Sequence, residues 1–397
     1  MMEPIAITGM GIVSAIGNNA AETLDALRCQ QTGVGRMKYL KTDHQEFPVG
    51  EVKMSDEEMK ILLDITEEPT TRTSLMGMLA IREALEDAGL TSPQESRVAF
   101  VSGTTVGGMD KSEQYYLDYL DGNTRNDYIK THDCGATTEM MANYFGIFSM
   151  VTSISTACSS AANAIILGAN LIRCGRVEIV VVGGCECITK FHLNGFNSLM
   201  ILDHSQCKPF DQNRAGLNLG EGAAYLVLET AESARRRGVK VKAVLSGYGN
   251  ACDAFHQTAS SDNGEGAFLA MQKALTLAGL KSCDIDYVNA HGTGTPNNDI
   301  SESQALLRVF GEQLPPISST KGLTGHTTSA SGSVEAVICI LALENGFFPG
   351  NYGWEKTMEN GIIPVSRMIA DQTLNHVMCN SFGFGGNDSC LIISRNE

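Results

Sequence analysis

The sequence predicts an α/β protein in which a core of strands and helices is duplicated and layered. An internal repeat is the first reason: 80–90 (AIREALEDAGL) matches 270–280 (AMQKALTLAGL), and each is an amphipathic helix closed by a glycine. The second reason is that a short apolar strand follows each of these helices, at 97–101 and at 285–288. The low polarity of helices such as 161–171 is the third reason, because such helices lie buried between sheets.

The other elements repeat in the same order in each half. In the first half, a strand ending at 154–156 leads into a small-residue helix near 159–173, and a strand at 178–184 follows. The equivalents in the second half are a strand at 317–320, a helix near 330–344 and a strand at 376–380, which runs into a glycine-rich turn at 382–386. Alternation of this kind predicts layers of sheet and helix.

The charged segment 232–239 is the best junction between the halves. It divides the chain into an N-terminal half, 1–237, and a C-terminal half, 238–397. Residues 110–146 do not fit the repeat and indicate an insertion. Because no Pro-rich or low-complexity linker separates the halves, we expect one compact unit.

Composition narrows the function classes. A net charge of -16 over 397 residues disfavours a nucleic-acid partner, because neutralising phosphates requires clustered positive charge. No apolar run reaches the ~18 residues of a membrane span, and no charged leader with an apolar stretch opens the chain. The 12 cysteines lack disulfide-like spacing, which favours a reducing cytoplasm. The close pair Cys185 and Cys187 follows an apolar run and predicts buried strand thiols, with no metal site.

Cys158 is the candidate nucleophile. It stands between an apolar strand and the start of a small-residue helix. A thiol at a helix N-terminus faces the positive end of the helix dipole, so the sequence predicts a thiolate near neutral pH.

Two histidines follow strands of the second half. His291 comes directly after the strand ending at Val288, and Lys321 and His326 come after the equivalent later strand. Ligand crevices of α/β sheets lie at such strand ends, so these groups and Cys158 predict a nucleophile with proton-handling or oxyanion-donating partners. Gly9-Met-Gly11 does not predict a dinucleotide site, because position 14 is Ser and no acidic residue closes the unit.

Together these motifs resemble the β-ketoacyl-[acyl-carrier-protein] synthases of the thiolase fold, most of all the elongating type II enzymes with a Cys-His-His site. The resemblance covers almost the whole chain. It rests on the order and spacing of the motifs at 7–11, 156–163, 209–214, 220–222, 289–296, 320–327 and 380–386.

The resemblance implies a duplicated five-layered α-β-α-β-α sandwich and a set of site roles. Cys158 matches the nucleophile that accepts the acyl chain, and His291 and His326 match the pair that binds the malonyl thioester carbonyl. Lys321 and Glu335 match the lysine and the acidic residue that order this pair. The backbone N–H groups of Cys158 and Phe384 match the oxyanion hole, and Phe384 also matches the gate.

The implied reaction is a decarboxylative Claisen condensation with malonyl-acyl carrier protein, in fatty acid or in polyketide or polyene biosynthesis. The resemblance implies no cofactor, because the substrates are carried on the phosphopantetheine of acyl carrier protein. It also implies a dimer, either of two copies or of this chain with a ketosynthase-like subunit that sets chain length.

Several positions depart from the family pattern. The segment 195–209 is shorter than usual, Asn298 stands where glycine is normal, and Thr328 and Ser329 replace an apolar residue and a glycine. These changes leave the choice of acyl chain open. A thiolase or an initiating synthase is disfavoured by the second histidine, His326, and a non-catalytic tunnel-shaping subunit is disfavoured because such subunits lack the nucleophile.

Overall fold

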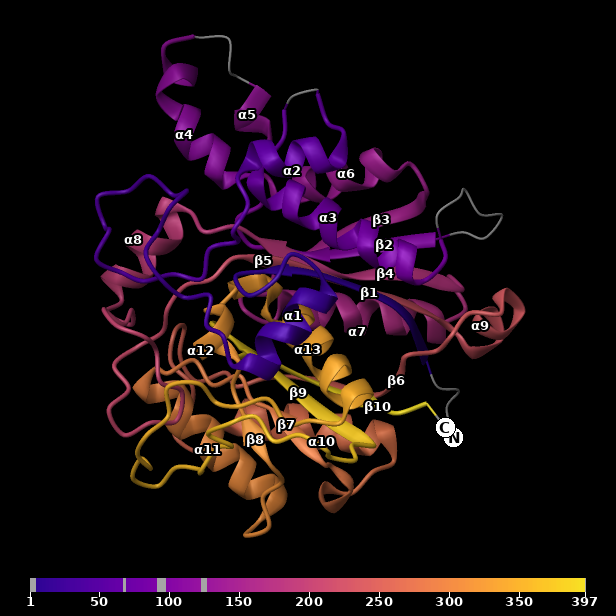
Figure 1. Cartoon of the computed structure of the whole chain (residues 1–397), viewed down its shortest axis with the longest axis vertical. Helices are drawn as coiled ribbons and strands as arrows, with labels where there is room; N and C mark the ends of the chain where they lie inside the picture. The colour runs from indigo at the N-terminus through magenta and orange to yellow at the C-terminus, as the bar shows by residue number, and fades with distance from the viewer. Residues whose placement is uncertain (1–4, 67–68, 91–97, 123–126, 397) are drawn as a thin grey trace.

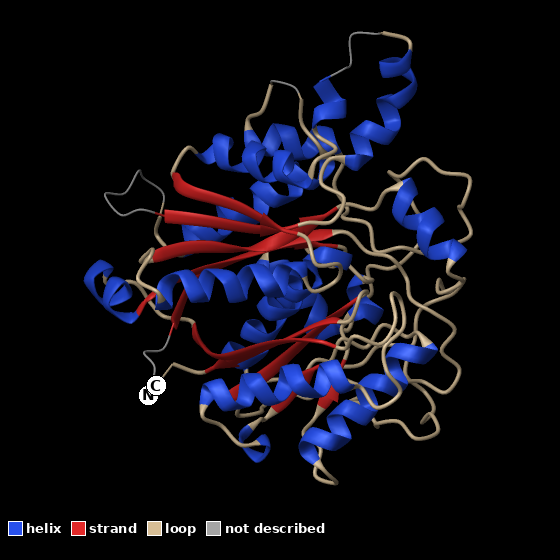
Figure 2. Cartoon of the chain, turned by 180° about the vertical axis from the view of Figure 1, so that it is seen from behind, coloured by secondary structure: helices blue, strands red, loops and turns tan. Residues whose placement is uncertain are grey.

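Helices and sheets alternate in layers through the molecule (Figures 1 and 2). The computed structural model describes residues 5–66, 69–90, 98–122 and 127–396. The strands are β1 (Ile5–Ser14), β2 (Val98–Gly103), β3 (Phe148–Ile154), β4 (Ile179–Glu186), β5 (Gly222–Thr230), β6 (Ala243–Cys252), β7 (Tyr287–Asn289), β8 (Ile317–Ser318), β9 (His376–Gly383) and β10 (Asn387–Ser394).

The helices cover and separate the strands. They are α1 (Ala20–Cys29), α2 (Asp56–Leu63), α3 (Arg72–Asp87), α4 (Met109–Leu120), α5 (Asp127–Lys130), α6 (Cys134–Phe145), α7 (Ser160–Arg173), α8 (Lys190–Ser198), α9 (Ala231–Arg237), α10 (Glu265–Ala278), α11 (Pro296–Phe310), α12 (Lys321–Thr324) and α13 (Ser331–Asn345). Two 3-10 turns complete the set, η1 (Ser282–Asp284) and η2 (Thr328–Ala330). No helix of the described residues is both long enough and apolar enough to cross a membrane.

The ten strands form one hydrogen-bonded sheet in the order β3-β2-β4-β5-β1-β6-β10-β9-β7-β8. Its two halves meet only where β1 pairs with β6 through Ile5–Ile7, so they diverge and leave room for a helical layer between them (Figure 2). That layer is α7 and α13, whose apolar side chains form one core with both half-sheets. Helix α3 covers the outer face of one half and α10 the outer face of the other. The predicted layered α/β fold is confirmed.

Paired glycines show the duplication in atomic detail. A Cβ on Gly11 of β1 would lie 2.1 Å from the carbonyl oxygen of Ala80 in α3, and one on Gly249 of β6 would lie 2.2 Å from that of Ala270 in α10. Ala80 and Ala270 are equivalent positions of the sequence repeat. In both halves, therefore, the repeated helix packs directly on strand backbone at a glycine, where no side chain intervenes. The glycines at the start of the chain therefore serve helix packing.

The structure refines the sequence prediction at three places. The charged segment 232–239 forms α9 and a turn, because the helix ends at Gly238 in the left-handed conformation. The second-half strand expected at 285–288 is observed at Tyr287–Asn289, because Ile285 caps the preceding turn η1 and pairing with β9 begins at Tyr287. Residues 110–146, the expected insertion, supply α4–α6 and connect the parallel strands β2 and β3. Arg97, at the start of the expected strand 97–101, lies outside the described residues, and the division into halves at residue 237 stays a prediction.

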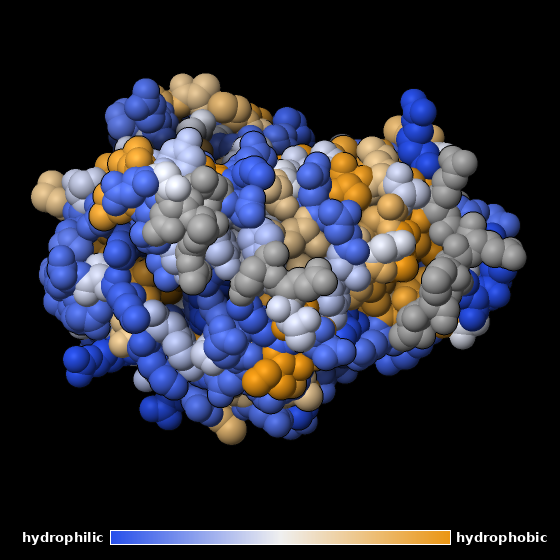
Figure 3. All heavy atoms as spheres, turned by 90° about the horizontal axis from the view of Figure 1, so that it is seen from above, coloured by the Kyte–Doolittle hydropathy of each residue, from blue (hydrophilic) through white to orange (hydrophobic). Residues whose placement is uncertain are grey.

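Cys185 and Cys187 are buried free thiols at the end of β4, as the sequence predicts. The face of the molecule that carries α2, α4 and α6 shows separate apolar patches among polar residues (Figure 3). Exposed apolar side chains on α2 and α4 are Ile61, Leu62, Tyr116, Leu117, Tyr119 and Leu120.

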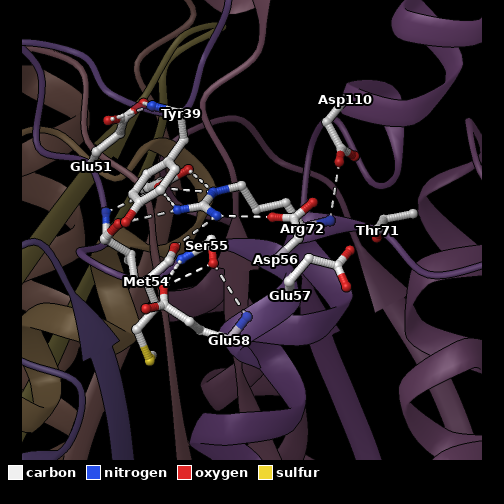
Figure 4. Close-up of polar contacts among 12 residues, drawn as sticks. Tyr39, Glu51, Met54, Ser55, Asp56, Glu57, Glu58, Thr71, Arg72 and Asp110 are labelled. Atoms are coloured by element: carbon white, nitrogen blue, oxygen red, sulfur yellow. Dashed lines mark hydrogen bonds and ion pairs between the residues drawn. The ribbon is translucent and has the colours of Figure 1, made fainter. Parts of the chain in front are cut away.

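A buried arginine fastens the start of α3 to two distant segments (Figure 4). The Arg72 guanidinium lies 2.6 Å from Glu221 Oε1, in the turn before β5, and 2.9 Å from Asp56 Oδ1, at the start of α2. It also donates to the carbonyl oxygens of Val52 and Met54. Removing one member of such a group leaves a buried charge without compensation.

We therefore expect Arg72→Ala to lower the free energy of unfolding by about 3–5 kcal/mol, because Glu221 would stay buried without its partner. Urea unfolding followed by circular dichroism measures this. Arg236→Ala is the matched control: its partner Glu178 is exposed, so the loss should stay below about 1 kcal/mol. Equal losses in the two variants would contradict the prediction.

Candidate active site

Cys158 lies in a tight turn between β3 and α7. The preceding residue, Ala157, has φ of 50°, which is uncommon for a residue other than glycine. The turn is held by Ser160 Oγ, which accepts from Thr156 N at 2.9 Å, and by Asn163, whose side chain donates to Thr156 Oγ1. Strained turns of this kind persist where the surrounding structure fixes them, often at functional sites.

The glycine-rich turn between β9 and β10 closes over this cysteine. A Cβ on Gly383 would lie 3.0 Å from the carbonyl oxygen of Thr156 and 3.2 Å from Cys158 N, so this close approach leaves little room for a side chain. The backbone N–H of the next residue, Phe384, lies near enough to the Cys158 sulfur to oppose the rise in the pKa of that thiol. Its ring stacks on Phe196 at a centroid distance of 5.8 Å.

His326 is the imidazole nearest to the sulfur. Its Nε2 lies 3.1 Å from Cys158 Sγ, and its Nδ1 lies 3.0 Å from Ser331 Oγ. The backbone of His326 pairs with the segment before β5, since its N–H donates to Asn218 O and its carbonyl accepts from Gly220 N, each at 2.8 Å. The ring position therefore depends on residues of the first half of the chain.

His291 faces His326 across the site. The two ring centroids are 5.2 Å apart and the rings are nearly perpendicular, at 84°. The loop after β7 that carries His291 is anchored by Glu302 of α11, whose carboxylate accepts from His291 N at 2.8 Å and Gly292 N at 2.7 Å.

Lys321 and Glu335 form a buried ion pair behind the histidines. The Lys321 ammonium also donates to the carbonyl oxygen of His291 at 2.6 Å and lies 3.4 Å from His291 Nδ1. Burial raises the pKa of Glu335 to about 7, against the pull of Lys321, and its Oε2 has no hydrogen-bond partner among the described residues. The structure thus brings together all six residues singled out by the sequence and the resemblance.

The protonation states follow from burial. Burial lowers the pKa values of His291 and His326 well below the ordinary value, and the charge of Lys321 lowers them further, so both imidazoles are neutral at pH 7. Burial also raises the pKa of Cys158 to about 12, although Lys321 and the Phe384 N–H oppose this. The expected thiolate is therefore wrong for the free enzyme: desolvation is the largest influence on this pKa, and Cys158 rests as a thiol.

A cavity of about 340 Å³ leads to these groups. Cys158, His291 and His326 lie on its wall and are buried, whereas Met200 on the same wall is 88% exposed, so the cavity reaches the surface. The remaining wall is mainly apolar and hydroxyl side chains, namely Phe196, Leu199, Ile201, Leu217, Thr258, Ser260, Thr293, Thr295 and Phe382.

Sequence reasoning missed three polar residues of the site. Glu302 anchors the His291 loop, Ser331 contacts His326, and Glu186 accepts from the hydroxyls of Thr104 and Ser329. Glu186 lies far along the chain from Thr104 and Ser329, and the 11 positions between His291 and Glu302 match no motif spacing. Ser331 lies five positions after His326, but a serine at a helix start is too common to be a signal.

Comparisons with known proteins identify the family. A family model for the N-terminal domain of beta-ketoacyl synthase matches residues 2–234, and one for the C-terminal domain matches 242–355. A 3-oxoacyl-[acyl-carrier-protein] synthase 2 of Vibrio cholerae is 32% identical over 98% of this chain and 99% of its own length.

Solved structures are similar over the whole chain. The ishigamide ketosynthase/chain length factor superposes with a TM-score of 0.93 at 29% identity, covering 100% of both chains. A ketosynthase in complex with its chain length factor from Xenorhabdus doucetiae gives 0.86 at 30% identity, covering 99% of this chain and 98% of that one.

The fold and the Cys-His-His cavity define a thiolase-fold acyltransferase. This chain belongs to the beta-ketoacyl synthase family. Within the described residues, no group of three or more His, Cys, Asp or Glu side chains is arranged to hold a metal ion.

We expect a substrate-like electrophile, such as a small epoxide with an acyl tail, to label Cys158 and no other thiol, because Cys158 alone among the 12 cysteines lines the cavity. The labelling rate should rise about tenfold per pH unit through pH 9, because the thiolate is the reactive form and the pKa is about 12. Peptide mapping by mass spectrometry measures both.

Cys158→Ala is the control and should stay unlabelled. Full label on another cysteine would contradict the prediction about the site. A rate that levels off below pH 8 would contradict the raised pKa.

Proposed function

We propose that this chain condenses an acyl group held on Cys158 with malonyl-acyl carrier protein, releasing CO2 and giving 3-oxoacyl-acyl carrier protein. The observation that carries this proposal is the meeting of the Cys158 thiol, His326 Nε2 at 3.1 Å and the His291 ring at the wall of one cavity. The name of the Vibrio cholerae relative supports the same reaction.

Acyl transfer comes first. The Cys158 sulfur attacks the carrier thioester, the carrier sulfur leaves as a thiolate, and the proton of the Cys158 thiol ends on that leaving sulfur. The backbone N–H groups of Cys158 and Phe384 hold the tetrahedral oxyanion, and Gly383 lets the second of these donors come close. An N–H at His326 Nε2 stabilises the negative charge that develops on the sulfur.

Condensation follows at the two histidines. A malonyl thioester enters, its carboxylate leaves as CO2, and the electron pair of the broken C–C bond becomes an enolate. His291 and His326 each present Nε2 to the enolate oxygen, because Lys321 and Ser331 occupy the Nδ1 sides. The enolate carbon then attacks the acyl carbonyl on Cys158, and the sulfur leaves as a thiolate that takes a proton from solvent. Neutral imidazoles suit this step, since each can donate one N–H.

The other site residues act through these groups. Lys321 supplies the positive charge nearest to the developing enolate and orients His291. Glu335 compensates the buried Lys321 ammonium. Phe384 gates the cavity together with Phe196, because their stacked rings line its wall beside Cys158.

The carrier is the proposed partner and its phosphopantetheine arm the proposed occupant of the cavity. Thr293 and Thr295 line the passage from the surface to Cys158, and their hydroxyls can pair with the amide groups of such an arm. All 12 cysteines are free thiols, which supports a location in a reducing cytoplasm. Fatty acid and polyketide or polyene biosynthesis both remain open as the pathway.

Two variants separate the chemical steps. Cys158→Ala should give no condensation product but keep malonyl decarboxylation, because the histidine pair acts without the nucleophile. His326→Ala should lose both, with decarboxylation down by about 10²–10³-fold, as for loss of one oxyanion donor. Labelled CO2 release and mass spectrometry of carrier-bound products measure these rates.

His44→Ala, which removes a partly exposed histidine paired with Glu46 outside the cavity, is the control and should leave both rates unchanged. Decarboxylation by His326→Ala at the original rate would defeat the role assigned to His326. Absence of any 3-oxoacyl product from the unmodified chain, offered carriers of graded chain length, would defeat the proposed function.

We also propose that β3 pairs with a second subunit. It is an edge strand that pairs only with β2, its sequence FSMVTSI carries no charge, and Met150 and Val151 are 41% and 37% exposed. An uncharged exposed edge is a template for pairing with another chain. The partner is a second copy or a ketosynthase-like subunit, as in the Xenorhabdus doucetiae complex.

Size-exclusion chromatography with light scattering decides between these partners. A homodimer has twice the 42.5 kDa mass of the chain when it is expressed alone, and Val151→Lys should make it monomeric. Ile363→Lys is the control, because Ile363 is exposed and its segment pairs with β8, at the opposite end of the sheet from β3. A monomer when expressed alone indicates the two-chain alternative. A dimer that survives Val151→Lys contradicts pairing through β3.

A further inference from the structure

Each catalytic histidine has a protein group at its Nδ1. The Lys321 ammonium lies 3.4 Å from Nδ1 of His291, and the Ser331 hydroxyl lies 3.0 Å from Nδ1 of His326. An ammonium can only donate a hydrogen bond, so Lys321 forces the proton of His291 onto Nε2. A hydroxyl can donate or accept, so the direction of the second contact depends on what else surrounds Ser331.

The surroundings of Ser331 favour donation to His326. Ser331 is the first residue of α13 and is 1% exposed. Side chains of a helix point back toward its N-terminus, which carries this hydroxyl toward His326 and Thr327. Thr327 Oγ1 lies 3.3 Å from Ser331 Oγ and can donate to it, which leaves the Ser331 proton for Nδ1 of His326.

The choice of nitrogen matters because His326 is neutral. Its pKa is lowered well below the ordinary value by burial and by Lys321, so the ring carries one proton for two nitrogens. A proton on Nδ1 would turn a lone pair of Nε2 toward Cys158 Sγ, 3.1 Å away, and toward the oxygen of an incoming thioester. A lone pair there repels the negative charge that both steps create.

We propose that Ser331 is the positioning residue that keeps the proton of His326 on Nε2, facing Cys158 and the malonyl thioester. Ser331 sets the tautomer of His326 as Lys321 sets that of His291, but it does so with a neutral hydroxyl in place of a charged ammonium. The catalytic use of this N–H rests on the proposed function, whereas the position of the proton does not. The side chain that hydrogen-bonds one ring nitrogen commonly sets the tautomer in this way.

Ser331→Ala tests the proposal, and Ser333→Ala is the matched control. Ser333 is buried in the same helix, but its hydroxyl donates to the carbonyl oxygen of Ala330 at 3.1 Å and does not contact His326. Both changes remove one oxygen atom from a buried helical serine, so a purely structural effect would appear in both.

The first measurement is the position of the proton itself. ¹⁵N spectra of histidine-labelled protein, assigned with His326→Asn, distinguish a protonated from an unprotonated ring nitrogen. We expect protonated Nε2 and unprotonated Nδ1 in the unmodified chain and in Ser333→Ala, and a mixture of both tautomers in Ser331→Ala. A proton on Nδ1 in the unmodified chain, or an unchanged tautomer in Ser331→Ala, would overturn the proposal.

The second measurement is labelled CO2 release from malonyl carrier in the Cys158→Ala background. Adding Ser331→Ala should lower kcat by about 10- to 100-fold, the range typical for loss of an orienting partner, with little change in KM. Adding Ser333→Ala should change neither. Equal rates for the two serine variants would overturn the proposal. No CO2 release even before the serine changes would instead count against the proposed function, and the ¹⁵N spectra would still decide the role of Ser331.

Discussion

The close packing of α7 against α13 between the two half-sheets is the constraint on which the site depends. A Cβ on Gly332 of α13 would lie 2.7 Å from the backbone nitrogen of Ala162 in α7, so the two helices touch almost backbone to backbone. Cys158 sits just before the start of α7, and His326 sits just before α13. The packing of two rigid helices therefore sets the 3.1 Å distance between Cys158 Sγ and His326 Nε2. The relative position of these two reactive groups is fixed by the hydrophobic core.

The same burial sets the electrostatics of the site. It keeps the thiol and both imidazoles uncharged and leaves the Lys321 and Glu335 pair as the charged groups behind the histidines. Backbone N–H groups and imidazoles then act as fixed dipoles on whatever negative charge the substrate develops, which is the arrangement that gives such donors their largest effect.

The sequence predicted the layered fold and the meeting of Cys158, His291 and His326, because strand ends and helix starts are local signals that converge in a duplicated fold. The role of Glu335 came only from the resemblance, since a lone glutamate in an apolar helix has no spacing that identifies its partner. One expectation failed for a physical reason: desolvation, a three-dimensional quantity, overrules the thiolate expected at Cys158.

The bare glycines beneath α3 and α10 also bear on how this protein can change over evolutionary time. The paired glycines at 11 and 249, each beneath the same repeated helix, are what the doubling of one α/β unit would leave in the strands. Once one copy offered a sulfur and the other imidazoles, each could diverge under its own selection while the shared scaffold stayed intact. Because one half carries the cysteine and the other the histidines, substitutions in the cavity wall could change the preferred substrate without a change of fold.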